Sequence, residues 1–470
     1  MLINKIISEL RASLPANPTD SQNRLLKHLA IFTIEGDEGG VLMVKGYAGT
    51  GKTTTLSTYV KVLGKYGFKV VLLAPTGRAA KVFSSYSNHS AYTIHKKIYR
   101  QKSSKDGFGR FDLEINLHTR TIFIVDEASM ISNKKSEGNI FGSGYLLNDL
   151  LTYVDSGKDC KLILMGDVAQ LPPVGLNISP ALDADNIILS SKIFYQTELV
   201  DVVRQSEDSG ILINATALRE KLAEGNINAP LLKCDNYDDI ILVSGNDLTE
   251  FLSDSYYKTG IDGTLVICRS NKRANKFNQG IRNQILGREE ELSAGDLLMV
   301  VKNNYFWLSE FQEADFIANG DIIEILKIHS FKELYGCRFC DCTIRLVDYD
   351  IELEVKLLLD TLHTETASQG PDENRKLFYN VLEDYSEVKP KRKQYQSVKD
   401  NPFFNALQVK YAYAVTCHKA QGGQWREVYI DAGYLTKEMI DSDYIRWLYT
   451  ALTRTTGKVY LVNFPDFLLE

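Results

Sequence analysis

The segment Gly46–Thr53 places glycines, a lysine and a hydroxyl side chain at fixed spacing, in the pattern G-x-x-x-x-G-K-T. It follows the apolar stretch Val41–Val44 and precedes the helix-prone stretch Thr54–Leu63. Glycines in such a loop allow backbone N–H groups to curl around phosphate oxygens, and the N-terminus of the following helix adds partial positive charge. A glycine-rich turn with a chance lysine would not need this strand-loop-helix context. The pattern therefore predicts a site for the phosphates of a nucleoside triphosphate.

Within this loop, Lys52 is expected to reach the β- and γ-phosphates and Thr53 to hold a Mg²⁺ ion. A second pattern, the apolar run Ile122–Val125 followed by Asp126 and Glu127, adds two carboxylates. Because the run predicts a strand, Asp126 would lie at its end beside the loop, where it can orient the metal ion and leave Glu127 to polarise an attacking water. The carboxylates could alternatively cap the next helix. Together with the phosphate loop, they predict hydrolysis of a nucleoside triphosphate.

Five short apolar stretches, separated by intervals that can mostly hold helices, predict the strands of a parallel α/β sheet. They are Val41–Lys45, Val70–Ala74, Thr121–Val125, Lys161–Met165 and Asn186–Ser190. A second series comprises strands expected at Thr264–Cys268, Glu427–Ala432 and Lys458–Asn463 and helices expected at Lys272–Ile285 and Tyr444–Thr453. The chain is thus predicted to contain two α/β domains.

The second series is interrupted between residues 292 and 404, which we interpret as an inserted accessory domain. Its β-like runs are Asp321–Ile328, Cys342–Val347 and Glu352–Leu357, and a polar, helix-prone stretch follows them. Three cysteines, Cys337, Cys340 and Cys342, cluster here. With His329 they could be imagined as zinc ligands. Their short spacing within one strand-like run puts Cys340 and Cys342 on one face, which favours buried strand cysteines instead.

Composition limits the class of protein. The chain has 470 residues, 44% of them hydrophobic and 24% charged, and a formal net charge of −6. That length predicts roughly two to four domains, and no apolar run is long enough to span a membrane. Met1–Ser13 lacks the features of a secretory signal, and the seven cysteines are thinly scattered, so we expect a cytoplasmic protein with reduced thiols. Any nucleic-acid contact is expected in a local groove, because the chain as a whole is not basic.

Beyond these patterns, the sequence resembles superfamily 1B DNA helicases of the RecD/Dda type, in particular the Dda-like branch, from about Thr19 to Val462. The family's motifs match at Ala74–Lys81 (motif Ia), Thr93–His95, Asp126–Met130 (Walker B), Gly166–Val174 (motif III), Val203–Gln205 (motif IV), Tyr411–Gly422 (motif V) and Leu448–Arg454 (motif VI). Motif V departs from the family at Cys417, where a serine is usual. The resemblance implies a DNA helicase with DNA-stimulated ATP hydrolysis and with ATP and Mg²⁺ as cofactors.

The resemblance also implies roles in the ATP site. Gln170 would sense the γ-phosphate, Arg204 would contact it, and Arg454 would be the arginine finger delivered across an inter-domain cleft that closes on ATP. Gln22 resembles the glutamine that reads adenine. The implied catalytic residues are Lys52, Asp126, Glu127, Gln170, Arg204 and Arg454. The implied nucleotide-binding residues are Gln22, Gly46, Ala48, Gly49, Thr50, Gly51, Lys52, Thr53, Thr54 and Gly422, and the implied metal ligands are Thr53 and Asp126.

Binding of single-stranded DNA without sequence preference needs backbone amides, hydroxyls and a few aromatic side chains. In the family, motif Ia and the short motif after it touch the strand, and here they supply Pro75, Thr76, Thr93 and His95. The candidates in the second α/β domain are Ser270, Asn271, Thr416 and His418. Any single one of these residues could instead be a helix cap or a turn residue.

A hairpin is predicted between Lys96 and His118, where the chain is basic and then glycine-rich. In Dda-like helicases a hairpin at this place is the pin that separates the strands. Phe108 or Phe111 would then be the wedge. The alternative is that these rings only anchor the hairpin.

The resemblance implies two RecA-like motor domains, a small hairpin insertion and an SH3-like β accessory domain. The predicted divisions are 1–95 and 121–215 for motor domain 1A, 96–120 for hairpin 1B, 216–291 and 405–470 for motor domain 2A, and 292–404 for accessory domain 2B with a helical extension. The expected activity is movement 5′→3′ on single-stranded DNA with separation of duplex, the direction coming from the resemblance alone.

Two other functions are compatible with part of this pattern. A translocase that remodels protein–DNA complexes with little unwinding would share every motif. A P-loop switch or AAA-type ATPase acting on protein would lack motifs V and VI. The expected partners are single-stranded DNA and single-strand/duplex junctions, and the protein is expected to be monomeric.

Overall fold

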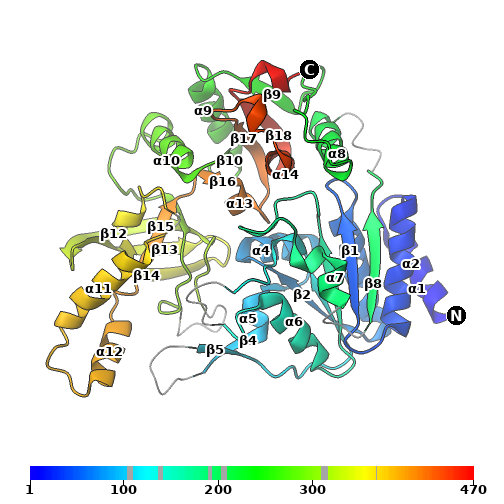
Figure 1. The fold of residues 1–470 in the computed structure, drawn as a ribbon, viewed down its shortest axis with the longest axis horizontal. Coiled ribbons are helices and arrows are strands. Elements are labelled where there is room, and N and C mark those ends of the chain that lie inside the picture. The colour runs from blue at the N-terminus through cyan, green and yellow to red at the C-terminus, as the bar shows by residue number, and fades with distance from the viewer. Residues whose placement is uncertain (103–109, 136–140, 189–192, 203–208, 309–315, 367) are drawn as a thin grey trace.

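The computed structural model describes residues 1–102, 110–135, 141–188, 193–202, 209–308, 316–366 and 368–470. The first α/β domain lies at the lower right of Figure 1, the second lies above it, and a β-barrel lies to the left. The N-terminus belongs to the first domain and the C-terminus to the second. Within the described ranges, no helix combines the length and apolar character needed to span a bilayer.

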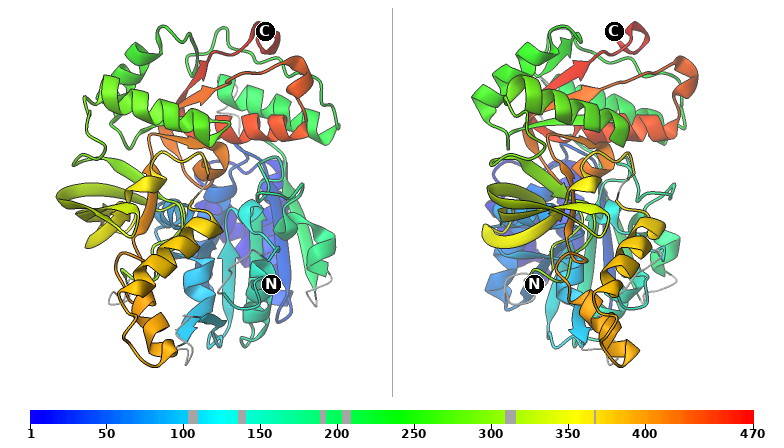
Figure 2. Two further views of the ribbon diagram at one scale, coloured as in Figure 1. Left: turned by 60° about the vertical axis from the view of Figure 1, so that its left-hand side comes forward. Right: turned by 90° about the vertical axis from the view of Figure 1, so that its left-hand side faces the viewer.

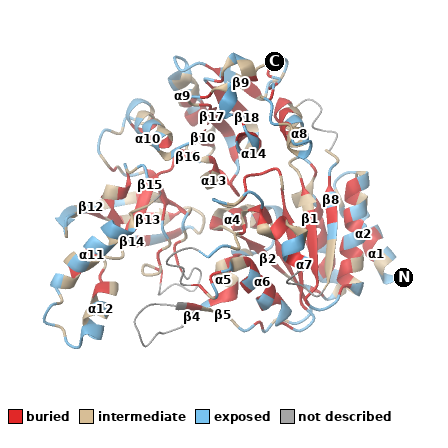
Figure 3. Cartoon of the chain, viewed as in Figure 1, coloured by how far each residue is buried: buried red, intermediate tan, exposed pale blue. Residues whose placement is uncertain are grey.

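The first domain is built on a six-stranded parallel sheet in the order β3-β2-β6-β7-β1-β8. Its strands are β1 (Val41–Gly46), β2 (Lys69–Ala74), β3 (Ala91–Thr93), β6 (Thr121–Val125), β7 (Lys161–Gly166) and β8 (Phe194–Leu199). Leu42 and Val44 pack into one hydrophobic cluster and Val41 and Met43 into another, so both faces of the sheet are covered. Figure 3 shows these strands as a buried layer.

The helices of the first domain divide between the two faces of this sheet. Side chains of α1 (Leu2–Ser13), α2 (Asp20–Glu35), α3 (Lys52–Leu63) and α4 (Gly77–Ser87) belong to one cluster, and those of α5 (Ile94–Ile98), α6 (Leu146–Asp155) and α7 (Ala184–Ile188) belong to the other. The first four predicted strands are confirmed. The fifth, Asn186–Ser190, is wrong, because Ala184–Ile188 is helical and β8 forms the sheet edge instead. Asp183 precedes this helix and accepts from the backbone N–H of Asp185 at 3.2 Å, which favours a helix start.

The second domain has a five-stranded parallel sheet in the order β16-β10-β17-β18-β9. The strands are β9 (Ile240–Val243), β10 (Thr264–Cys268), β16 (Ala414–Thr416), β17 (Trp425–Asp431) and β18 (Thr455–Val462). The helices are α8 (Gly210–Ala223), α9 (Leu248–Thr259), α10 (Asn271–Gly280, continued by a π-helical turn, Ile281–Ile285), α13 (Cys417–Ala420) and α14 (Ser442–Leu452). Because Ile211 and Leu218 of α8 pack in this domain's core, the second domain begins before the predicted boundary at residue 216.

The accessory domain is a closed barrel of β11 (Leu297–Val300), β12 (Ile322–Leu334), β13 (Cys337–Leu346), β14 (Ile351–Leu358) and β15 (Leu407–Tyr411). Its last strand lies beyond the predicted boundary at residue 404. Cys340 and Cys342 are buried in its core on β13, as the strand interpretation predicted. The closer description of the barrel as SH3-like stays a prediction.

Two helices, α11 (Pro371–Glu383) and α12 (Lys391–Lys399), extend the barrel. Leu377 and Val398 pack with Phe339 and Leu358 of the barrel strands. Figures 1 and 2 show the pair on the side of the barrel that faces away from the second α/β domain. The polar stretch after the β-like runs is therefore helical, as predicted.

The barrel enters and leaves the second domain at one tight junction. Asp296, which is fully buried just before β11, pairs with Arg282 at 3.0 Å and with Arg288 at 2.8 Å. Tyr413, just after β15, donates to the same carboxylate at 2.8 Å. Only Ala412 and Tyr413 separate β15 from β16.

A small antiparallel hairpin, β4 (Tyr99–Lys102) and β5 (Arg110–Leu113), leaves the first domain after α5. It lies within the range predicted for the pin. Its turn falls in residues 103–109, outside the described ranges.

Candidate nucleotide and nucleic-acid sites

The phosphate loop connects the end of β1 to the start of α3. Gly49 and Gly51 adopt left-handed φ angles of 75° and 78°, a conformation that glycine tolerates best. The hydroxyl of Thr50 donates to the Tyr47 carbonyl at 2.8 Å and holds the curl of the loop. Thr53 and Thr54 lie in the first turn of α3. The loop therefore has the backbone shape that the sequence predicts for phosphate binding.

The ammonium group of Lys52 points back over the loop. Its Nζ donates to the Tyr47 carbonyl at 2.8 Å and lies 3.8 Å from Oδ2 of Asp167. Asp167 follows β7, the neighbour of β1 in the sheet. Lys52 thus lies between the phosphate loop and the segment matched to motif III.

The two predicted carboxylates follow β6 directly. Oδ1 of Asp126 accepts from the backbone N–H of Glu127 at 2.8 Å. Burial, with the negative charge of Glu127 second, raises the pKa of Asp126 to about 7. Glu127 itself has a left-handed φ of 53°, an uncommon conformation for a residue other than glycine. Its carboxylate lies toward the second domain.

Arg454 of the second domain reaches this carboxylate across the inter-domain cleft. Its Nη1 lies 3.7 Å from Oε1 of Glu127, and its side chain is only about 5% exposed. The guanidinium also donates to the carbonyls of Thr450 at 3.1 Å and Gly423 at 3.5 Å. Arg454 of the second domain therefore meets Glu127 of the first domain across the cleft, the placement that the family resemblance implies.

Tyr449 was not predicted as a site residue, although it stands inside the segment matched to motif VI. It is fully buried, and its hydroxyl accepts from the backbone N–H of Ala48 at 2.9 Å. The same hydroxyl donates to Oδ2 of Asp167 at 2.6 Å. One side chain of the second domain thus joins the phosphate loop to motif III.

The motif III segment is held by the second domain at further points. The backbone N–H of Leu171 donates to the hydroxyl of Thr450 at 2.9 Å, and Nε2 of Gln421 donates to the Leu171 carbonyl at 2.7 Å. Gln170 is buried, and its Oε1 has no hydrogen-bond partner among the described residues. A buried amide oxygen of this kind can accept from a ligand.

Gln22, the predicted adenine reader, connects α2 to the phosphate loop. Its amide nitrogen donates to the Thr50 carbonyl at 3.0 Å, and its amide oxygen accepts from the backbone N–H of Thr19 at 3.0 Å. The hydroxyl of Thr19 accepts in turn from Gln22, which completes a capping box at the start of α2. Both ends of the amide are therefore engaged within the protein.

Three of the predicted DNA-binding residues line one cavity of about 260 Å³ between the second domain and the barrel: Asn271, Thr416 and His418. Lys410 and Lys419 line it too and were not predicted. Burial lowers the pKa of each lysine to about 8. Burial also lowers the pKa of His418, which favours the neutral form of its ring. The cavity is therefore a local basic groove in a chain of negative net charge.

A second cavity of about 340 Å³ adjoins the groove and shares Arg269 and His418 with it. It extends along the segment 171–177, which follows motif III, to the start of α14. The guanidinium of Arg269 lies 5.3 Å from the ring centroid of Tyr444. Arg269 directly precedes the predicted Ser270, but nothing in the sequence set it apart from other surface arginines.

The predicted hydroxyl residues Thr76, Thr93 and Ser270 are N-caps of α4, α5 and α10. Each hydroxyl oxygen accepts from the backbone N–H three residues later at 3.2 Å. These placements match the helix-cap alternative. The N-termini of α4 and α10 carry partial positive charge, which favours an anion there. Pro75 is half-buried beside the first of them. Gly422, expected near the nucleotide, instead lies against α4, where a Cβ would be 2.8 Å from that of Ala79.

His95 and Phe111 differ from their predicted roles as DNA contacts. The His95 ring packs 4.8 Å from the ring of Phe141, and burial lowers its pKa to about 4. Phe111 is 3% exposed and lies 4.8 Å from Phe141 and 4.9 Å from Tyr305 of the barrel domain. These are the contacts of an anchor at the base of the hairpin. Phe108 and Arg204 lie outside the described residues.

Comparison with known proteins adds two domain families. Residues 19–242 match the AAA domain family, and residues 411–462 match the UvrD-like helicase C-terminal domain family. The first match contains the phosphate loop, Asp126 and motif III, and the second contains Arg454.

Three relatives illustrate the range of similarity. An uncharacterized protein of Methanocaldococcus jannaschii is 24% identical over 92% of this chain and 37% of its own length. The ATP-dependent RecD2 DNA helicase of Deinococcus radiodurans is 30% identical over 33% of this chain and 20% of its own length. The ATP-dependent DNA helicase dda of Enterobacteria phage T4 is 26% identical over 55% of each chain. The chain therefore spans between a fifth and just over half of the length of these three relatives.

Proposed function

Because this chain belongs to the superfamily 1B helicases of the RecD/Dda type, we propose that it is an ATP-dependent DNA helicase that moves 5′→3′ along single-stranded DNA and separates duplex. The observation that carries the proposal is the meeting of Arg454 with Glu127 across the cleft between the two motor domains. An arginine aimed at developing charge on the γ-phosphate accelerates hydrolysis, and its arrival from a second domain couples hydrolysis to domain movement.

Each group around the cleft has a role in the proposed reaction. Lys52 binds the β- and γ-phosphates, Glu127 orients the attacking water, and Arg454 stabilises charge on the transferred phosphoryl group. Thr53 and Asp126 offer the hard oxygen ligands that Mg²⁺ prefers, so the residues present fit this ion. The ion would supply charge neutralisation at the phosphates. Gln170, whose amide oxygen lacks a partner among the described residues, is the candidate sensor of the γ-phosphate side of the site.

The basic groove supports single-stranded DNA as the substrate. Lys410, Lys419 and Arg269 provide cations for phosphates, and Asn271 and Thr416 provide neutral hydrogen-bonding groups. The groove lies between the second motor domain and the barrel, whereas the N-terminus of α4 lies on the first motor domain. A strand that contacts both domains would be moved when the cleft closes and opens. The 5′→3′ direction rests on the family alone.

The second candidate is a translocase that strips proteins from DNA with little unwinding. It is favoured by one observation, the burial of Phe111, which removes one of the two candidate wedges from the surface. Strand separation would then depend on Phe108 or on another part of the hairpin turn.

Unwinding of forked duplexes that carry only a 5′ or only a 3′ single-stranded tail tests both candidates. We expect wild-type protein with ATP to unwind the 5′-tailed substrate, and Lys52→Ala to unwind neither. Unwinding of the 3′-tailed substrate alone would reverse the direction. On the same forks loaded with a DNA-bound protein, stripping of that protein without strand separation would favour the translocase. Unwinding by Lys52→Ala would remove the ATP-driven mechanism.

A further inference from the structure

Helix α4, which begins within motif Ia, is stacked on a tryptophan of the other motor domain. The Cζ atom of Arg78, on α4, lies 4.0 Å from the ring centroid of Trp425, on β17. Trp425 is 6% exposed. Next to this stack, the hydroxyl of Tyr86 donates to Oε1 of Gln424 at 2.8 Å. A planar guanidinium over an indole face is the strongest common form of cation–π contact, and it gains strength when water is excluded.

The segment that precedes Trp425 packs tightly against α4. A Cβ added at Gly423 would come within 2.8 Å of Nε of Arg78 and 2.4 Å of Cη2 of Trp425. Gly422, at a left-handed φ of 74°, leaves no more room against Ala79. Both glycines are therefore required for the two domains to approach this closely.

On the second domain, hydrogen bonds connect the segment of Trp425 to Arg454, the candidate arginine finger. The backbone N–H of Trp425 donates to the Arg454 carbonyl at 3.0 Å, and Nη1 of Arg454 donates to the Gly423 carbonyl at 3.5 Å. Arg454 in turn lies 3.7 Å from Glu127. A displacement of Trp425 therefore moves the backbone and one guanidinium partner of Arg454 together.

On the first domain, the stack lies close to the proposed DNA contact at the start of α4. Arg78 lies in the first turn of α4, two residues after the N-cap Thr76. One turn further along, Lys81 donates to the Val347 carbonyl of the barrel domain at 2.9 Å and pairs with Asp348 at 3.5 Å. Helix α4 is thus held between the barrel and the second motor domain.

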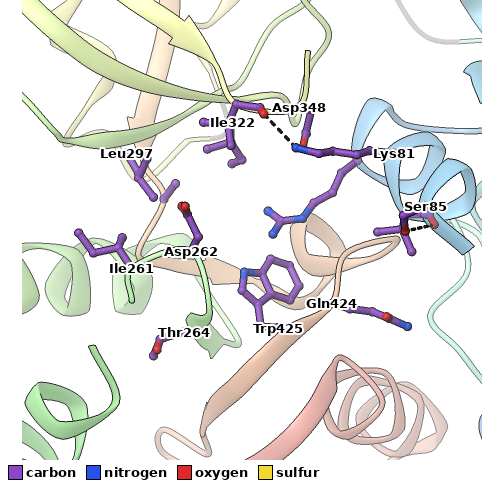
Figure 4. Close-up of a pocket in the computed structure, with 14 residues that line it drawn as sticks. Lys81, Ser85, Ile261, Asp262, Thr264, Leu297, Ile322, Asp348, Gln424 and Trp425 are labelled. Carbon is purple, nitrogen blue, oxygen red and sulfur yellow. Dashed lines mark hydrogen bonds and ion pairs between the residues drawn. The ribbon is translucent and has the colours of Figure 1, made fainter. Parts of the chain in front are cut away.

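Figure 4 shows the cavity between these parts, of about 320 Å³, with Trp425 and Gln424 on one side and Lys81 and Asp348 on the other. Because this space adjoins the stack, the guanidinium can leave the indole without displacing packed core. Among the described residues, neither Arg78 nor Trp425 lines the groove, and no hydrogen bond or ion pair joins either of them to the phosphate loop. A role in coupling, and not in binding ATP or DNA, follows from their position.

We propose that the Arg78–Trp425 stack is the coupling contact through which DNA at the start of α4 positions Arg454 against Glu127. With the strand bound, α4 is fixed, the stack is held, and Arg454 stays aligned for hydrolysis. Without the strand, the stack opens into the neighbouring cavity and Arg454 loses its alignment. This inference rests on the proposed function, because it assumes ATP hydrolysis that DNA stimulates.

ATP hydrolysis at saturating ATP, measured with and without saturating single-stranded oligonucleotide, tests the proposal. Trp425→Leu keeps an apolar side chain but removes the π face, and Trp425→Phe keeps a π face. We expect Trp425→Leu to lower the DNA-stimulated kcat by at least about fivefold, which is the lower end of common coupling factors. The rate without DNA and the oligonucleotide concentration that gives half-maximal stimulation should stay unchanged. Trp425→Phe should retain most of the stimulation.

Arg78→Met, a change on the partly exposed side of α4, provides a second route should Trp425→Leu fold poorly. It should lower the stimulated kcat to the same extent, and the Arg78→Met/Trp425→Leu double variant should lose no more than either single variant, because the two side chains act as a unit. Additive losses would overturn the proposal, as would an equal loss of stimulated and unstimulated rates. A wild-type protein without any DNA-stimulated hydrolysis would instead refute the proposed function.

Discussion

Tyr449 gives the clearest residue-scale test of communication between the motor domains. Its hydroxyl bonds both the Ala48 amide and the Asp167 carboxylate. Tyr449→Phe removes both bonds without changing the shape of the side chain. A hydrogen bond to a charged group contributes about 1.5 to 3 kcal/mol, so we expect kcat for ATP hydrolysis to fall about tenfold or more.

The same helix supplies a matched control for this substitution. Tyr444 is also buried on α14, but its hydroxyl has no hydrogen-bond partner among the described residues. Tyr444→Phe should leave kcat unchanged and keep or raise the melting temperature, because it removes a buried, unpaired polar atom. Equal effects of the two substitutions on kcat would show that the Tyr449 bridge does not contribute.

The two lysines of the groove predict how DNA binding depends on pH. Lys410 and Lys419 have pKa values lowered to about 8 by burial, so each loses its charge as pH rises through that value. Affinity for single-stranded DNA should therefore fall between about pH 7 and about pH 9.5, and the slope of log K against log salt should shrink by about 0.7 for each charge lost.

Lys419→Arg is the control for this titration, because an arginine stays charged throughout the range. Its salt slope should change less with pH than that of the wild type. Titration of binding by fluorescence anisotropy at both pH values gives the slopes. Identical slopes at the two pH values in the wild-type protein would contradict a role for these lysines in phosphate contact.

At this scale the sequence was informative where a motif fixes both residue type and place. Lys52, Asp126, Glu127 and Arg454 are found together as predicted. Tyr449, Arg269 and Lys410 were missed for a physical reason. Each of them belongs to a site that forms only when segments far apart in the chain pack together, and no local spacing in the sequence predicts that packing.

At the scale of elements, the hairpin depends on an aromatic cluster at its base. Phe111 is buried against Phe141 and against Tyr305 of the barrel domain. Phe111→Ala should destabilise the protein by about 3 to 5 kcal/mol, as for other buried phenylalanines, and should reduce unwinding more than DNA-stimulated ATP hydrolysis. Thermal melting and the number of base pairs opened per ATP would measure the two effects.

Two other phenylalanines make the hairpin experiment specific. Phe331, on β12, is 57% exposed. Phe331→Ala should therefore change neither the melting temperature nor the number of base pairs opened per ATP. Phe108→Ala should reduce unwinding without loss of stability if Phe108 is the wedge. Loss of unwinding and ATP hydrolysis in equal measure in Phe108→Ala would exclude that role.

The errors at element scale share one cause. The run Asn186–Ser190 is short and apolar, and such runs suit a strand or a buried helix equally well. The predicted boundary at residue 404 placed residues 405–411 in the motor domain, whereas β15 (Leu407–Tyr411) completes the barrel. Which sheet a strand joins is decided by its partners, and those come from distant parts of the chain.

At the scale of the whole molecule, Asp321 marks the contact between the barrel and the first motor domain. A Cβ at Gly77 of α4 would lie 2.9 Å from Oδ1 of Asp321. Burial raises the pKa of Asp321 to about 7. An acid with a raised pKa in the folded state contributes stability below its unfolded value, about 3.9, and that contribution is lost as pH rises through about 7.

Asp321→Asn should therefore melt at a higher temperature than the wild type at about pH 8.5, with a smaller difference at about pH 6. Asp254→Asn is the control, because Asp254 is an exposed acid on α9 paired only with Lys258 within its own helix among the contacts described. A difference in melting temperature between wild type and Asp321→Asn that is the same at both pH values would contradict the predicted energetic cost of ionising Asp321.

The junction around Asp296 has a consequence for measurement. Two residues separate β15 from β16, and Arg282, Arg288 and Tyr413 all contact Asp296. We therefore expect the barrel to turn together with the second motor sheet. A dye on the outer end of β12 would therefore report the angle of that sheet, amplified by the length of the barrel.

Six of the seven cysteines are buried, and only Cys337 is partly exposed. After its replacement, single-molecule energy transfer between an introduced cysteine on β12 and one on α1 would follow each ATP cycle as a rotation in real time.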